Sequence, residues 1–225
     1  MPTVLLIGAS RGIGFELAHQ FREAGWRVIA TARSAEGLER LNALGCEALR
    51  VDVAEPAGNS GLAWQLDGEK LDLAVYVAGA MDRTAAPQPP ARDAFDAVMH
   101  TNVMGAMQVI PQILPMLQEV RGTLACISSV MGSLQDTTSG NAALYRVSKA
   151  ALNMVVRCLQ AEQSDVTVVA LHPGWVQTEM GGAQAPLTPE QSAASLRQTL
   201  DQIRTSKRPE HRGAFFNHDG TPLPW

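Results

Sequence analysis

The chain alternates between short apolar runs and longer stretches in which apolar residues recur every three or four positions. Seven short runs are predicted to be β-strands, because they are rich in β-branched residues and most are apolar throughout. Strands that are apolar on both faces are typical of a parallel sheet covered by helices. The predicted strands are TVLLIG (3–8), RVIAT (27–31), ALRVDV (48–53), LDLAVYVAG (71–79), GTLACISS (122–129), VTVVALH (166–172) and GAFFN (213–217).

Helical patterns lie between these runs. They fall near residues 12–24, 34–44, 93–119, 145–163 and 189–205, with a weaker one near 55–67. This alternation predicts an α/β fold of the Rossmann type, a doubly wound parallel sheet of about seven strands with helices on both faces. No repeat or linker divides the chain, so a single domain over residues 1–225 is expected. Pro111 and Pro115 lie inside the pattern 93–119, and a kink or break is expected there.

Composition narrows the class of protein. Hydrophobic residues make up 46% of the 225, and the net charge is −4. An acidic chain without a basic run is a poor candidate for nucleic-acid binding. No apolar stretch is long enough for a membrane span, and the first residues do not resemble a signal peptide. The three cysteines are widely spaced, and Cys126 and Cys158 are expected to be buried free thiols. A cytoplasmic location fits these features.

The segment LLIGASRGIGFELAHQF begins as a strand and ends as a helix, with Gly8, Gly12 and Gly14 in the turn. Glycine allows a sharp turn and a close approach of the backbone to a ligand. The start of a helix offers free N–H groups that suit a pyrophosphate. The segment therefore predicts a dinucleotide site, and a tight turn with nothing bound is the alternative.

The end of the second strand indicates which dinucleotide. An acid commonly stands there when the ribose 2′-hydroxyl is bound. Here Thr31 and Ala32 occupy that region, Arg33 follows, and Arg11 lies in the glycine turn. Guanidinium groups without a competing carboxylate suit a 2′-phosphate. The predicted cofactor is therefore NADP(H) rather than NAD(H).

Spaced motifs carry a family resemblance over the whole chain. They are GASRGIG (8–14), VDV (51–53), AG (78–79), Asn102, ISS (127–129), YRVSK (145–149) and HPGWVQTEM (172–180). In these motifs the chain resembles the short-chain dehydrogenase/reductase family. It is most similar to the small carbonyl reductases of the sniffer and C-factor type. The support is YRVSKAALN, the polar insertion before it, and the ending GAFFNHDGTPLPW.

The resemblance implies a single NAD(P)-binding domain and a role for each matching residue. Tyr145 would be the general acid/base, Lys149 its partner, Ser129 the group that orients the carbonyl, and Asn102 a link in a proton relay. The implied cofactor contacts are Gly8, Ser10, Arg11, Ile13 and Gly14 for the pyrophosphate and adenosine, Asp52 and Val53 for the adenine, Ala78 and Gly79 along the cofactor, and Pro173, Val176 and Thr178 for the nicotinamide, with Tyr145, Lys149 and Arg33 completing the set.

The chain departs from the family pattern at two places. Tyr76 and Val77 stand where two asparagines are usual, which removes a polar link between strands. The interval from Ser129 to Tyr145 is longer than in many relatives, which leaves Ser128 and Ser129 as alternatives. Neighbouring residues of a strand point to opposite faces, so one of the two serines is expected to face the substrate, and the motif favours Ser129.

The chemistry suits reduction of a carbonyl group. Tyr145 and Lys149 are four residues apart, on one face of the predicted helix. The ammonium group is expected to lower the pKa of the phenol, which is ordinarily near 10. The Ser129 hydroxyl would hydrogen-bond the carbonyl oxygen. An ordinary tyrosine beside a surface lysine is the alternative for the pair taken alone.

The leading hypothesis is an NADP(H)-dependent reductase of a small ketone, aldehyde or quinone. There are two alternatives. One is a signalling protein of the C-factor type that uses the same scaffold with bound cofactor, and the other is an enzyme working in the oxidative direction.

Loops 130–143 and 180–188 are expected to border the substrate. No metal cluster is expected among the histidines. Helices 93–119 and 145–163 are apolar on more than one side, and family members often pair these helices into dimers or tetramers. A homodimer is therefore expected, and a homotetramer or a monomer is the alternative.

Overall fold

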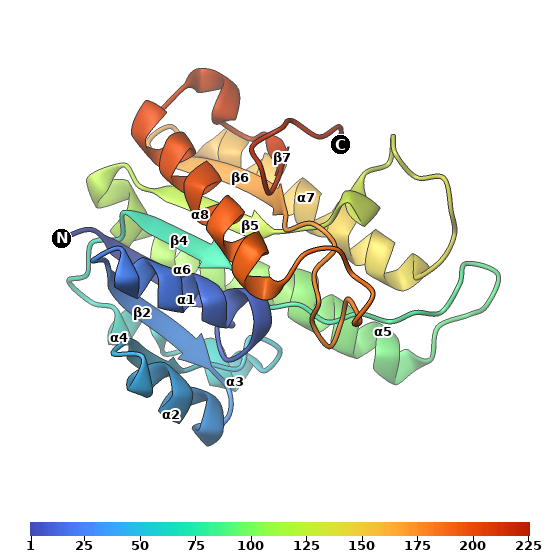
Figure 1. The fold of residues 1–225 in the computed structure, drawn as a ribbon, viewed down its shortest axis with the longest axis horizontal. Helices are drawn as coiled ribbons and strands as arrows, with labels where there is room; N and C mark the ends of the chain where they lie inside the picture. Colours follow the sequence, from blue (N-terminus) through green and yellow to red (C-terminus); the bar gives the residue numbers. More distant parts are fainter.

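The computed structural model describes residues 1–225 and contains one seven-stranded parallel sheet (Figure 1). The strand order is β3-β2-β1-β4-β5-β6-β7, and every neighbouring pair runs parallel. The strands are β1 (Thr3–Ile7), β2 (Arg27–Ala32), β3 (Glu47–Arg50), β4 (Leu73–Tyr76), β5 (Thr123–Ile127), β6 (Thr167–His172) and β7 (Phe215–Asn217). The order reverses between β1 and β4, so a crevice for a ligand is expected there. The predicted Rossmann-type fold is confirmed.

Helices cover both faces of the sheet (Figure 1). The helices are α1 (Gly12–Glu23), α2 (Ala35–Ala43), α3 (Pro56–Asn59), α4 (Leu62–Gln65), α5 (Arg92–Met99), α6 (Gly105–Val120), α7 (Ala143–Glu162) and α8 (Pro189–Ser206). A π-helical turn, η1 (His100–Met104), joins α5 to α6, and the 3₁₀ turns η2 (Val130–Gly132) and η3 (Pro209–His211) lie before α7 and β7.

Each face of the sheet has its own hydrophobic core. Leu17 and Phe21 of α1 and Leu196 of α8 belong to one cluster of 23 buried residues. Ile110 of α6 and Leu152 of α7 belong to a second cluster of equal size. The inner strands are buried throughout, as the apolar runs predict.

The helical pattern 93–119 is interrupted, but not at the prolines where a kink or break was expected. The α-helical geometry is interrupted at η1, whereas Pro111 and Pro115 lie inside a continuous α6. Both prolines and Met107 are exposed. Their i, i+4 spacing places the carbonyls that lose a donor on the solvent side, where water can serve them. The expectation of a kink at the prolines was therefore wrong.

The strand predicted at 71–79 is also shorter than expected. The N–H groups of Val77 and Ala78 both donate to the carbonyl of Ile7, each at 2.9 Å. Two successive N–H groups cannot bond one carbonyl within a regular ladder. The backbone therefore leaves the sheet after Tyr76, and AG (78–79) lies in the loop beyond it.

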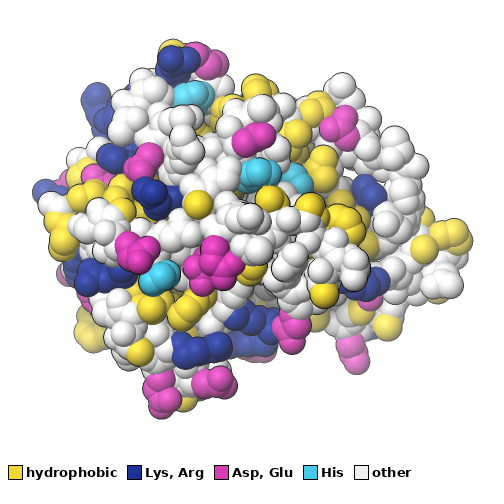
Figure 2. All heavy atoms as spheres, in the orientation of Figure 1, with side chains coloured by type: hydrophobic (Ala, Val, Ile, Leu, Met, Phe, Trp, Pro, Cys, Tyr) yellow, Lys and Arg dark blue, Asp and Glu magenta, His cyan; other side chains and the backbone are white.

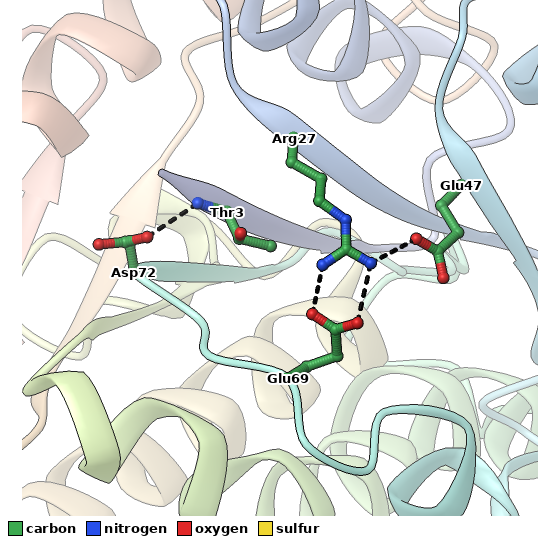
Figure 3. Close-up of polar contacts among 5 residues, drawn as sticks. All are labelled: Thr3, Arg27, Glu47, Glu69 and Asp72. Carbon is green, nitrogen blue, oxygen red and sulfur yellow. Dashed lines mark hydrogen bonds and ion pairs between the residues drawn. The ribbon is translucent and has the colours of Figure 1, made fainter. Parts of the chain in front are cut away.

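The amino ends of the strands are joined by a polar cluster (Figure 3). Arg27 at the start of β2 pairs with both oxygens of Glu69 and donates to Glu47 of β3 at 2.6 Å. Thr3 N–H donates to the Asp72 carboxylate at 2.8 Å. The bond from Arg27 lowers the pKa of Glu69. Arg27 thus links β2 to β3 and to the segment before β4, and Asp72 links that segment to β1, at the end of the sheet remote from the candidate site.

The surface carries charges of both signs. Basic and acidic side chains are interspersed on the face drawn in Figure 2, without an extended patch of one sign. No helix combines the length and apolarity needed to span a bilayer. Cys46 and Cys126 are buried free thiols, but Cys158 is exposed, contrary to the expectation for that residue.

Candidate functional site

The predicted site residues lie at or just beyond the carboxyl ends of the strands, toward the right of Figure 1. Gly8 follows β1, Arg33 follows β2, and Asp52 and Val53 follow β3. The segments Ala78–Gly79, Ser128–Ser129 and Pro173–Thr178 follow β4, β5 and β6, respectively. Because the strands are parallel, all these segments share one edge of the sheet.

The glycine turn depends on the absence of side chains. Gly8 has a φ of 87°, and a Cβ there would lie 2.8 Å from Ala78 atoms. A Cβ on Gly14 would lie 2.6 Å from the carbonyl oxygen of Gly8. No side chain caps the first turn of α1, and that turn holds no acidic residue. The cradle and the uncapped N–H groups fit a dinucleotide pyrophosphate.

At the ribose end, the Gly8 N–H donates to the hydroxyl of Thr31 at 3.0 Å. Thr31 is 1% exposed. The residue that replaces the usual acid therefore links β2 to the glycine turn. Arg33 is exposed just beyond it.

Arg11 is paired with a residue that the sequence did not indicate. Its guanidinium forms an ion pair with Glu179, from the segment after β6, and both side chains are largely exposed. A Cβ on Gly12 would lie 3.3 Å from Thr178 Cγ2. The segment 178–179 therefore lies against the glycine turn, and a carboxylate competes for one of the two candidate phosphate ligands.

Tyr145 lies in the first turn of α7 and is 7% exposed. Burial raises the pKa of its phenol to about 12, and a hydrogen bond with the Ser129 hydroxyl opposes that rise. The expectation of a lowered pKa for Tyr145 was therefore wrong. The phenol is thus held in its protonated form at neutral pH.

Lys149 lies one turn further along α7 and is 3% exposed. Its ammonium donates to the carbonyl of Ile127 at 2.8 Å and lies 5.7 Å from the centre of the Tyr145 ring. Burial lowers the pKa of Lys149 to about 8. The ammonium is directed toward the end of β5 rather than toward the phenol, which explains why it does not offset the effect of burial on Tyr145.

The two serines after β5 have different environments. Ser128 donates to the side chain of Asn153 on α7 at 2.6 Å, and Asn153 donates to the carbonyl of Gly132 at 3.2 Å. The Ser129 hydroxyl accepts from the N–H of Met131 at 3.1 Å and lies close enough to the Tyr145 phenol to oppose the rise of its pKa. Ser128 therefore ties the strand to α7, and Ser129 is the serine directed toward Tyr145.

Asn102 lies in the η1 turn and is fully buried. Its amide accepts from the Ala80 N–H at 2.7 Å and donates to the Ala80 carbonyl and to Ser148, each at 2.8 Å. A Cβ on Gly79 would lie 3.5 Å from this amide oxygen and 3.6 Å from the Lys149 nitrogen. Asn102, Lys149 and the loop after β4 are therefore neighbours.

Tyr76, which stands where an asparagine is usual, makes a polar link of its own. Its buried hydroxyl donates to the carbonyl of Thr101 in η1 at 2.7 Å. A Cβ on Gly105 would lie 2.7 Å from that hydroxyl. The polar link between strands is thus replaced by a link from β4 to the turn that holds Asn102.

The other predicted contacts lie along the same edge. The Asp52 carboxylate accepts from the Ala54 N–H at 3.1 Å, and Val53 is buried. The Pro173 carbonyl accepts from Ser192 at 2.7 Å, which fixes the start of segment 173–178. Ser10 precedes Arg11 in the glycine turn, and Ile13 lies in the first turn of α1. The side chains of Asp52 and Ser10 remain partly accessible.

Three loops that follow the carboxyl ends of the strands contact one another. The Ala86 N–H donates to Gly140 at 2.8 Å, so loop 80–91 contacts the polar insertion. Arg83 donates to the carbonyl of Met180 in the segment after β6. Leu134 is 80% exposed and Trp175 is 56% exposed in these loops. These loops thus carry exposed apolar side chains among polar ones.

A family model described as short chain dehydrogenase matches residues 2–187. The chain belongs to the short-chain dehydrogenase/reductase family. It is therefore an oxidoreductase of that family, whose members use NAD(P).

Two relatives of known sequence extend the match. The chain is 35% identical to 1-hydroxy-2-glutathionyl-2-methyl-3-butene dehydrogenase of Rhodococcus sp. (strain AD45), with all of both chains covered. It is 42% identical to the C-signal protein of Myxococcus xanthus over 128 residues, covering 55% of this chain and 74% of that protein.

Solved structures of short-chain dehydrogenases match over the whole chain. The carbonyl reductase Sniffer of D. melanogaster has a TM-score of 0.91 and 27% identity, with all of both chains covered. A short-chain dehydrogenase/reductase from Burkholderia multivorans, crystallised with NADP, has a TM-score of 0.90 and 31% identity, covering 100% of this chain and 99% of the other. The resemblance to the sniffer and C-factor type is confirmed.

Sequence reasoning missed four residues near the site of this short-chain dehydrogenase. Ser148 and Asn153 follow Tyr145 at spacings that place them on the inner face of α7, which the helical period could have indicated. Glu179 and Arg83 contact residues that are distant in the sequence, so no local pattern indicates their partners. No group of His, Cys, Asp or Glu side chains is arranged to hold a metal ion.

Proposed function

We propose that this chain is an NADP(H)-dependent carbonyl reductase that converts a small ketone, aldehyde or quinone to an alcohol. The observation that carries the proposal is that Ser129, at the end of β5, lies beside the phenol of Tyr145, with the buried Lys149 ammonium 5.7 Å from the centre of that ring. A hydroxyl beside a protonated phenol suits a carbonyl oxygen, which needs a hydrogen-bond donor and then a proton.

The glycine cradle and the first turn of α1 would hold the pyrophosphate, and Arg33 and Arg11 the 2′-phosphate. Asp52 and Val53 would contact the adenine, Ala78 and Gly79 would lie along the cofactor, and Pro173, Val176 and Thr178 would hold the nicotinamide. The neighbour with bound NADP, at 31% identity, supports this choice of cofactor. When bound, NADPH supplies the hydride to the carbonyl carbon.

The residues of the chain would bind the substrate oxygen and supply its proton. Ser129 would hydrogen-bond the substrate oxygen while negative charge develops there. Tyr145 would donate its proton to that oxygen, and the raised pKa keeps the phenol protonated until then. The Lys149 ammonium uses one donor on Ile127, so its remaining donors can serve a ribose hydroxyl or a water molecule. Asn102 would hold the backbone of Ala80 and join the proton path beside Lys149.

The proposal is tested by following NADPH oxidation by the purified protein with a panel of ketones, aldehydes and quinones. At least one class should be reduced. NADPH should be preferred over NADH by about tenfold or more, because a charge-assisted bond to the 2′-phosphate contributes about 1.5–3 kcal/mol and about 1.4 kcal/mol is a tenfold change in affinity. Tight NADPH binding with no turnover on any class would refute the proposal.

A second candidate is a signalling protein that uses the cofactor-bound scaffold. The match to C-signal over 128 residues favours it. In that case a Tyr145→Phe variant would keep its biological effect, because signalling would not need the phenol. The intact set of Ser129, Tyr145 and Lys149 favours the enzyme.

We also propose that the protein forms homodimers or homotetramers and works in the cytoplasm. Met107 of α6 and Val147 and Met154 of α7 are each more than half exposed. Exposed apolar residues on neighbouring helices suit a second copy. Light scattering after size exclusion should give at least a dimer, and Met154→Glu should lower the mass. The unpaired thiols suit a reducing compartment.

A further inference from the structure

We propose that Trp225 is a positioning residue for the substrate pocket, fixing the loop that follows Ser129. The inference rests on the proposed function, because it assigns selectivity among carbonyl substrates to that loop. The tail 218–225 lies far from Ser129 in sequence but contacts residues 133–135 directly.

The tail folds back on the last strand. The Asn217 N–H donates to the Thr221 carbonyl and the Leu223 N–H to the Phe215 carbonyl, each at 2.8 Å. Phe216 and Pro222 form an antiparallel bridge. This hairpin turns the chain back beside β7, and residues 222–225 run antiparallel to that strand and reach the loop after Ser129.

The Trp225 ring is held on two sides. It stacks on the Phe215 ring with centroids 5.4 Å apart and planes inclined by 22°. The Arg157 guanidinium of α7 lies 5.9 Å from its centre. Such aromatic and cation–π contacts favour one orientation of the side chain and hence of its backbone.

The main-chain oxygen of Trp225 is bound by the loop. It accepts from the N–H groups of Leu134 and Gln135 at 3.0 and 3.1 Å, and from the Ser133 hydroxyl at 3.3 Å. Ser133 is 1% exposed, whereas Leu134 is 80% exposed. The oxygen thus fixes the backbone from which an exposed apolar side chain projects.

A continuous set of contacts joins this anchor to Ser129. The Ser133 N–H donates to the Val130 carbonyl at 3.0 Å, and the Gly132 N–H to the Ser129 carbonyl at 2.8 Å. Gly132 is pressed against α7, since a Cβ there would lie 2.8 Å from the Lys149 carbonyl carbon. The segment 129–135 is therefore held by α7 at one end and by Trp225 at the other.

The two sets of contacts of the segment 129–135 are therefore predicted to have different roles. The contacts with α7 keep Ser129 and Lys149 in place, and the contact with Trp225 fixes residues 133–137, at the start of the polar insertion. Loosening the second contact should change which carbonyl compounds fit, while NADPH binding remains as it was.

The test compares Trp225→Ala with Trp225→Phe, which keeps an aromatic ring, and Trp225→Leu, which keeps an apolar side chain if the alanine variant folds poorly. Trp64→Ala is the control, because Trp64 is 83% exposed on α4. Amide hydrogen exchange is measured over residues 130–137. The ratio of kcat/KM values for a small and a bulky carbonyl compound and the NADPH dissociation constant are measured in parallel.

Exchange over 130–137 should accelerate in Trp225→Ala, and the ratio should change by about fivefold or more, because small displacements at a reacting site are costly. Trp225→Phe should restore both. Unchanged exchange, or faster exchange with an unchanged ratio, would overturn the proposal. A wild-type protein that reduces no carbonyl would instead refute the proposed function, and the exchange data would still show whether Trp225 anchors the loop.

Discussion

The Lys149 ammonium donates to the Ile127 carbonyl at 2.8 Å and lies 5.7 Å from the centre of the Tyr145 ring. The two side chains share a face of α7, but the ammonium is bound to the end of β5. Burial lowers the pKa of Lys149 to about 8 and raises that of Tyr145 to about 12. At neutral pH both groups are therefore protonated, which suits a proton donor and a charged neighbour.

The pKa values of Lys149 and Tyr145 predict how kcat depends on pH. Lys149 carries its charge below its pKa and loses it as the pH rises through about 8. Tyr145 stays protonated over that range, so loss of its proton cannot cause the change. The kcat for carbonyl reduction should therefore fall as the pH rises through about 8. A kcat that stays constant there would contradict the role given to the ammonium, and Lys70→Met, at an exposed lysine, should leave the profile as in the wild type.

The two serines after β5 provide a matched pair of variants. Ser129→Ala removes the hydroxyl that faces Tyr145, so kcat should fall by about 10²-fold or more. Ser128→Ala removes the bond to Asn153 and should mainly lower the melting temperature. Steady-state kinetics and thermal unfolding of both variants separate the roles. A larger loss of kcat in Ser128→Ala would reverse the assignment.

The ion pair of Arg11 with Glu179 predicts an effect on cofactor affinity. Glu179→Gln removes the carboxylate that competes for the guanidinium, so NADPH should bind about two- to fivefold more tightly, a small change because exposed ion pairs contribute little. NADH, which lacks the 2′-phosphate, should gain less. Titration of both cofactors by fluorescence checks this, and weaker NADPH binding in Glu179→Gln would show that the ion pair supports the site.

The hydrogen bond of Tyr76 with Thr101 predicts a loss of stability when the hydroxyl is removed. Tyr76→Phe keeps the ring but leaves the buried Thr101 carbonyl without the donor at 2.7 Å. The free energy of unfolding should fall by about 1 kcal/mol or more, which lowers the melting temperature by about 2–4 °C. Trp64→Phe, at an exposed position, should leave the melting temperature unchanged. An unchanged value for Tyr76→Phe would mean that another donor or water satisfies Thr101.

The sequence predicted the sheet and the placement of the site because both depend on local patterns. Apolar runs fixed the strands, and the residues following them gather at one edge of any parallel sheet. The sequence did not indicate η1, whose contacts with the Tyr76 hydroxyl join segments that only the folded chain brings together. The prolines of α6 were misleading for a similar reason, since their cost depends on which side of the helix faces water.

The pKa values and the ion pair of the site could not be predicted from local sequence patterns either. The spacing of Tyr145 and Lys149 gave their common face but not the burial that sets both pKa values. Likewise, two arginines without a nearby acid in sequence suggested a phosphate site, yet Glu179 contacts Arg11 from 168 positions away. Trp225 and Leu134 are a third case of contact between distant segments.

The central claim is that Tyr145 supplies the proton in an NADPH-dependent reduction, and the Tyr145→Phe variant tests it most directly. Its kcat for the best carbonyl substrate and its NADPH dissociation constant should be measured beside those of the wild type. The account predicts that kcat falls by about 10²–10⁴-fold, the usual contribution of a general acid, with NADPH affinity unchanged. A kcat within about twofold of the wild type, well below that contribution, would contradict it.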